Sequence, residues 1–166
     1  MLTATAKLTQ SDFNVLWITL SGYRDIAQRV AVGFDDEPTR FAANKCMLII
    51  DRLHAAIHPD SACSDELFTK SAQVETNDAS EIVRYLFARH VECSEVVPLI
   101  PLVEGRYALL YFALFFRELS DAWQFLDQGN FPQFVSRLTT MQTRCFGEIN
   151  FSNLLASRGL AVAATA

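Results

Sequence analysis

The sequence predicts an all-α protein that folds as a single-domain bundle of five to six helices. Three observations lead to this fold class. The chain of 166 residues has the length of one domain. Apolar residues recur at helical spacing along much of it. One long apolar segment, about 106–128, contains alanine and leucine in number and lacks internal glycine and proline, which favours a helix over a strand. We expect this segment to be the buried, aromatic-rich central helix.

The central segment is apolar on all sides in its first half, because the ten residues 107–116 are all apolar. The face that carries Leu110 and Ala113 becomes polar only at Arg117. A helix without a polar side is buried on every side, in its own domain or against a partner. Leu110 and Ala113 are therefore candidate partner-binding residues. Arg117 and Glu118 interrupt the apolar run before it reaches the about 20 residues that a membrane span needs, so we reject a membrane helix.

Residues 99–110 admit a competing interpretation. Glu104 and Gly105 lie between two apolar runs, which is the pattern of a tight β-hairpin. Pro98 and Pro101 weaken the first run as a strand, because proline cannot donate to a ladder of hydrogen bonds. A helix is the preferred interpretation, and the hairpin is the alternative.

The other helices are bounded by capping and breaking residues. They are expected at about 10–32, from 38 or 39 to 57 or 58, at about 81–92, and from 131 onward. Asn130 is expected to cap the last helix. Pro59 ends the second, because the residue before a proline is driven out of the helical conformation. We expect 1–8 and 160–166 to be loose and 59–80 to form a long polar loop, which is unusual inside a compact domain.

Composition indicates a cytoplasmic protein without a cofactor. The net charge of −5 argues against nucleic-acid binding, which requires a basic face. The four cysteines form no CxxC pair, and we expect mostly buried free thiols in a reducing cytosol. The first residues lack the apolar core of a signal peptide. All six glycines are isolated, so no phosphate-binding loop is present.

Two histidines and one aspartate form a candidate metal site. His54 and His58 have the i,i+4 spacing at which two imidazoles on one helix face can bind one metal ion. Asp51 lies one turn earlier on the same stripe, about 10 Å from His58 along the axis, so further ligands must come from elsewhere. The stripe lies away from the apolar face of its helix. We therefore expect Asp51, His54 and His58 to face solvent or a partner.

A second pattern is an arginine followed, after five other residues, by a histidine. It occurs twice, as Arg52 with His58 and as Arg84 with His90. HEPN-type ribonucleases carry an Arg-x4-6-His motif in an all-helical bundle and build their site at a dimer interface, so the spacing and helical class resemble that family. The resemblance implies that the histidine transfers protons and the arginine stabilises phosphate charge.

This sequence departs from that family in one respect. The residue after the arginine is usually polar there, whereas an apolar or aromatic residue follows here. Arg52 and His58 also lie about 120° apart on a regular helix. Such a site therefore requires the helix to end between them.

The leading functional hypothesis is a non-enzymatic interaction protein: a small adaptor, an accessory or regulatory subunit, or a self-associating bundle. Catalytic motifs are missing, while thirteen phenylalanines and the apolar central segment indicate a buried interface. Arg137 and Arg144 share one face of the last helix and are candidates for docking an acidic partner. The alternative is an enzyme, either a HEPN-like ribonuclease or a metal-dependent helical bundle.

Overall fold

The computed structural model describes residues 10–57 and 79–147, and this part of the chain is a bundle of helices. The prediction of an all-α bundle is confirmed. None of the described helices has both the length and the apolar character that crossing a membrane requires. The helices are α1 (Gln10–Gly33), α2 (Glu37–Ile57), α4 (Ala79–Val96), α5 (Val103–Asp127) and α6 (Phe131–Gly147), with the short 3-10 helix η3 (Val97–Leu99) between α4 and α5.

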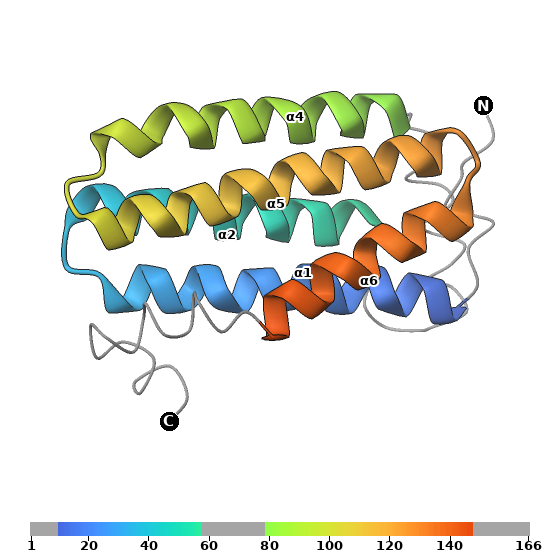
Figure 1. Ribbon diagram of the computed structural model, residues 1–166, viewed down its shortest axis with the longest axis horizontal. Coiled ribbons are helices and arrows are strands. Elements are labelled where there is room, and N and C mark those ends of the chain that lie inside the picture. Colours follow the sequence, from blue (N-terminus) through green and yellow to red (C-terminus); the bar gives the residue numbers. More distant parts are fainter. Residues whose placement is uncertain (1–9, 58–78, 148–166) are drawn as a thin grey trace.

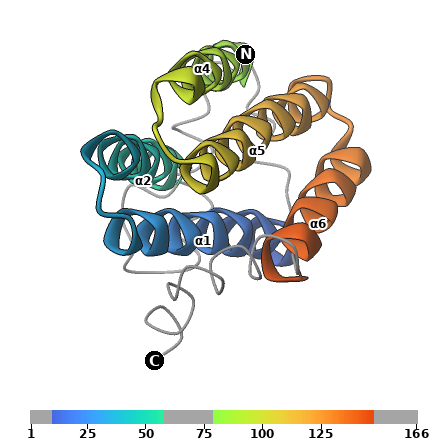
Figure 2. The ribbon, with the colours of Figure 1, turned by 60° about the vertical axis from the view of Figure 1, so that its left-hand side comes forward.

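Helix α5 occupies the middle of the bundle. Figure 2 shows α4, α2, α1 and α6 arranged around it, and α6 crosses the bundle obliquely. Helices α1 and α2 form one antiparallel hairpin, and α4 and α5 form another (Figure 1). Helix α5 packs most extensively against α4 and also contacts α6 and α2.

The core is built around the aromatic residues of α5, as the sequence predicts. Phe112, Phe116 and Trp123 are fully buried. The Trp123 ring meets the ring of Phe134 from α6 edge to face, with centroids 5.8 Å apart. Burial of each such side chain stabilises the fold by about 1.5–3 kcal/mol. The aromatic-rich helix therefore joins the two hairpins and α6 into one core.

Expected boundaries of α5 and α4 differ from the structure, and α4 also continues to Val96 rather than ending near 92. Helix α5 begins at Val103, so the hairpin alternative for 99–110 is wrong. Helix α4 begins at Ala79, two residues before the expected start, because Ala79 is buried and anchors the first turn. Residues 79 and 80 are therefore helical rather than part of a loop. The remainder of the predicted loop, and the predicted loose segments 1–8 and 160–166, lie outside the described residues.

Side-chain caps fix two helix starts. The Asp36 carboxylate accepts a 3.1 Å hydrogen bond from the backbone N–H of Thr39, so α2 begins at Glu37, just before the expected residue. Asn130 caps α6 as predicted, because its side-chain oxygen accepts a hydrogen bond from the N–H of Gln133.

Candidate functional site

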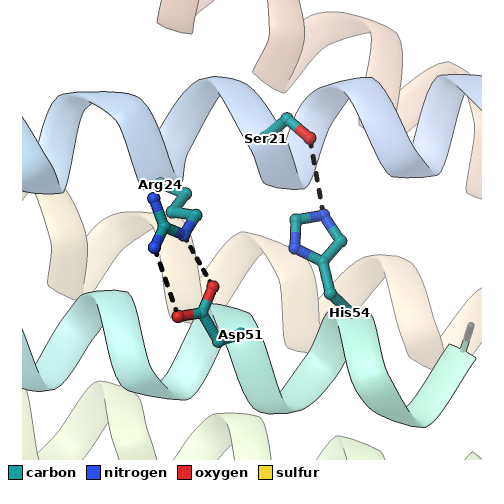
Figure 3. A network of polar contacts seen from close by, with 4 residues as sticks. All are labelled: Ser21, Arg24, Asp51 and His54. Carbon is teal, nitrogen blue, oxygen red and sulfur yellow. Dashed lines mark hydrogen bonds and ion pairs between the residues drawn. The ribbon is translucent and has the colours of Figure 1, made fainter. Parts of the chain in front are cut away.

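The predicted metal stripe lies against α1 in a polar seam. Figure 3 shows Arg24 from α1 reaching the carboxylate of Asp51 on α2. Arg24 Nε donates to Asp51 Oδ1 over 2.6 Å, and a second guanidinium nitrogen lies 3.4 Å from Oδ2. The hydrogen bond to this carboxylate raises the pKa of Arg24 above its ordinary value. Asp51 thus forms a cross-helix ion pair.

His54 also faces α1, next to the ion pair. Its Nε2 lies 3.5 Å from Ser21 Oγ (Figure 3), and its ring lies against Trp17 with centroids 4.2 Å apart. The stripe was expected to face solvent or a partner; the Asp51 side chain is still 45% exposed, but both Asp51 and His54 also contact α1. The apolar face of α2 turns toward the core, and the adjoining stripe packs against the neighbouring helix of the hairpin.

The polar seam contains the residue types of a metal site and of a serine nucleophile paired with a histidine base. In the described part of the chain, no group of three or more His, Cys, Asp or Glu side chains is placed to hold a metal ion. His58 lies outside the described residues. Ser21 and His54 are a hydroxyl next to a base, but their 3.5 Å separation exceeds the about 2.6–3.2 Å of an activated nucleophile. The Asp51 carboxylate, which would complete a triad, binds Arg24 instead. These contacts join α1 to α2.

The two Arg–His pairs of the HEPN-like motif have different positions. Arg84 and His90 both lie within α4, which continues unbroken through them, so they project about 120° apart. Arg84 is exposed, whereas His90 Nδ1 donates to the Ala113 carbonyl over 2.8 Å and joins α4 to α5. Arg52 is exposed near the end of α2, and its partner His58 lies outside the described residues.

Helix α5 has an outward side that is apolar in its first half. Val103 is 65% exposed, Tyr107 54%, Leu110 52% and Leu114 42%. We call these four residues the apolar stripe. Of the two expectations for this half, burial in its own domain or against a partner, the first does not hold for the apolar stripe, and Leu110 is accessible at the surface.

Ala113 is not part of the accessible surface. It is only 3% exposed, and its carbonyl accepts the hydrogen bond from His90. Its proposed place in a docking surface is therefore corrected. The neighbouring surface belongs to α4 instead, where Phe87 and Val91 are partly exposed. The sequence shows these two residues at i,i+4 spacing, which was the available signal for them.

Arg137, the other predicted docking residue, already has contacts inside the chain. Its guanidinium lies 3.6 Å from the Asp121 carboxylate of α5 and over the Phe125 ring, 5.8 Å from the centroid. It therefore helps to hold α6 on α5. The Arg144 side chain lies outside the described residues.

An apolar cavity of about 270 Å³ lies between α2 and α4, with α5 as its floor. Two buried free thiols, Cys46 and Cys93, line it with their sulfur atoms 3.9 Å apart. The hydrogen bond to Cys93, together with burial, raises the pKa of the Cys46 thiol well above its ordinary value. Buried free thiols are confirmed at these two positions. Sequence patterns do not reveal the cavity, because its shape depends on how two separate helices pack.

Comparison with protein-family models, curated proteins and solved structures finds no match to this chain. The fold itself defines the class, an all-α bundle organised around one aromatic helix.

Proposed function

We propose that this protein is a non-enzymatic, self-associating interaction module and that the apolar stripe on α5 binds a second copy of the chain. The observation that carries the proposal is the stripe itself, four large apolar side chains exposed in a row on the central helix. Contiguous exposed apolar patches on soluble proteins mark interaction sites, because water contact with them is unfavourable.

The spacing of the stripe suits helix pairing. Its members follow one another at +4, +3 and +4 residues, the alternation of positions that face a partner in a coiled coil. The opposite side of the same helix, including Leu109, Phe112 and Phe116, is buried in the bundle. Helix α5 therefore has one apolar side that packs in its own core, and the narrower apolar stripe faces outward.

The apolar stripe is complementary to the apolar stripe of a second copy when the two α5 helices are antiparallel. When two α5 helices are related by a two-fold axis, Val103 meets Leu114 of the second copy and Tyr107 meets Leu110 of the second copy. The symmetry repeats both pairs, which gives four apolar layers without a charged residue in any of them. An interface of this kind uses the same patch on both subunits, as closed dimers do. This fit favours a second copy over an unrelated partner.

Neighbouring residues extend the proposed interface. Phe87 and Val91 lie on α4, the helix that packs beside α5, and are 49% and 39% exposed. Figure 1 shows α4 and α5 running side by side along the length of the bundle. We further propose that the dimer works as an adaptor or regulatory subunit in the cytoplasm. Mostly buried free thiols, as at Cys46 and Cys93, are usual for proteins of a reducing compartment.

Substitution of Leu110 by arginine tests the proposal. We expect the wild-type chain to have the mass of a dimer in sedimentation-velocity measurements at micromolar concentration. Leu110→Arg places one charge from each copy in the central layers of the paired apolar stripes. We therefore expect the variant to be a monomer with unchanged helical circular dichroism. Val32→Arg is the matched control, because Val32 is 74% exposed on α1, outside the stripe; it stays a dimer. A monomeric wild type, or a dimeric Leu110→Arg variant, would contradict the proposal.

A further inference from the structure

The cavity between α2 and α4 has an apolar interior. Leu109 and Phe116 of α5 form its floor, Cys46 and Cys93 line it below the mouth, and Phe41 lies at an exposed position on its wall. Apolar cavities of about 150 Å³ take up small hydrocarbons because water gains few hydrogen bonds inside them. The present cavity, about 270 Å³, lies just below the about 300–1,000 Å³ range of small-molecule sites. It has room for one alkyl chain, and a bulky cofactor does not fit.

The charges around the cavity are unbalanced. Lys45 Nζ lies 3.1 Å from Glu92 Oε1, and a terminal guanidinium nitrogen of Arg89 lies 3.8 Å from Glu92 Oε2. All three residues line the cavity. Two cations therefore share one carboxylate, and the second contact is long for a hydrogen bond. The mouth has a net positive charge.

Arg89 is the less satisfied of the two cations. Its side chain is only 24% exposed, and its Nε is buried without a hydrogen-bond partner in the described part of the chain. Its guanidinium lies over the Tyr85 ring, 4.9 Å from the centroid, a contact that gives Nε no acceptor. A buried donor without an acceptor is unfavourable, so an additional anionic acceptor at this position stabilises it.

We propose that this cavity binds a medium-chain fatty-acid anion. The alkyl chain lies against Leu109, Phe116 and the two thiols, and the carboxylate binds Arg89 and Lys45 in place of Glu92. An apolar interior selects a hydrocarbon chain, and the excess of cations selects an anionic head group over a neutral or cationic one. The cavity residues are separate from the apolar stripe, so this proposal stands independently of self-association.

Isothermal titration of decanoate into the full chain tests the site. We expect one decanoate to bind per chain. Decan-1-ol has the same chain without the charge, and we expect it to bind about tenfold more weakly, because it loses the charge-assisted hydrogen bonds. Decyltrimethylammonium is expected not to bind. Equal affinity for all three compounds, or no binding of decanoate, would overturn the proposal.

Variants locate the binding to this cavity. Arg89→Met and Lys45→Met are each expected to weaken decanoate binding, Arg89→Met by about tenfold because its charge is the more buried. Arg84→Met is the control, because Arg84 is an exposed arginine on the same helix outside the cavity; it retains wild-type affinity. Ala42→Leu adds volume to the cavity wall at a half-buried position and is expected to block the chain. Lys45 is half exposed, so its variant folds and remains informative if Arg89→Met does not. Wild-type decanoate affinity in the Lys45→Met and Ala42→Leu variants would place the ligand elsewhere and overturn the assignment.

Discussion

Two tyrosines in the bundle have hydroxyls in different environments. The Tyr23 hydroxyl of α1 donates to the Met141 carbonyl of α6 over 3.0 Å, and both residues are buried. The Tyr85 hydroxyl of α4 is buried without a hydrogen-bond partner in the described part of the chain. The same chemical change at the two positions therefore separates the contribution of a hydrogen bond from that of the aromatic ring.

We predict that Tyr23→Phe lowers the free energy of unfolding by about 0.5–1.5 kcal/mol, because it removes one buried hydrogen bond between α1 and α6. Tyr85→Phe is the matched control and is expected to leave stability unchanged or to increase it slightly, because it removes a polar atom that has no partner. Urea unfolding followed by circular dichroism measures both. Equal losses in the two variants would contradict the role assigned to the Tyr23 hydroxyl.

At the scale of elements, the N-terminal turn of α5 approaches α2 closely at Gly105. A Cβ atom at this position would lie 2.6 Å from Thr39 Oγ1 and 2.7 Å from Ile100 Cγ2, both far inside van der Waals contact. Gly105 is helical and buried, so the absence of a side chain is what permits this packing. The glycine that suggested a hairpin turn in the sequence is therefore a close-packing residue.

We predict that Gly105→Ala destabilises the protein by about 1–3 kcal/mol through overpacking, although alanine is the better helix former. In a Thr39→Ala background, the contact with Thr39 Oγ1 is removed and the contact with Ile100 Cγ2 remains. The cost of Gly105→Ala is then smaller by at least about 0.5 kcal/mol, the coupling expected of residues in contact. Thermal or urea unfolding of the four proteins in this cycle provides the measurement. Strictly additive costs would show that Thr39 does not contribute to the overpacking and would contradict the α5–α2 contact as its cause.

The periodicity of apolar residues predicted the helices, but it did not predict which of their side chains the neighbouring helices cover. The run of apolar residues predicted α5 because helix propensity and the absence of glycine and proline act locally. The same run did not distinguish Leu110, which is exposed, from Ala113, which is buried, because both are apolar and the difference depends on where α4 packs. The ion pair of Asp51 was missed for the same reason, since its partner Arg24 lies on another helix. The candidate surface was therefore predicted in part, and the cavity not at all.

At the scale of the whole molecule, α1 is tied to the rest of the bundle through Tyr23. This residue donates to α6, and its ring stacks on Phe115 of α5 with centroids 4.0 Å apart. The α1–α2 hairpin consequently shares its core with α5 and α6 rather than forming a separate unit. Shared burial of this kind makes unfolding cooperative, because exposing one element exposes the core face of the others.

The chain's two tryptophans test this cooperativity, because they report on different parts of the bundle. Trp17 lies on α1 against His54, and Trp123 lies on α5 against Phe134. In Trp17→Phe the fluorescence comes from Trp123 alone, and in Trp123→Phe it comes from Trp17 alone. We predict that, within each variant, fluorescence and far-UV circular dichroism give the same urea midpoint and the same slope, of about 1–3 kcal/mol/M. Comparison within one variant removes the effect of the substitution on overall stability. A Trp17 transition at lower urea than the loss of helix would show instead that the α1–α2 hairpin detaches first, because the Tyr23 contacts that hold it to α5 and α6 would then be weaker than the packing among α4, α5 and α6.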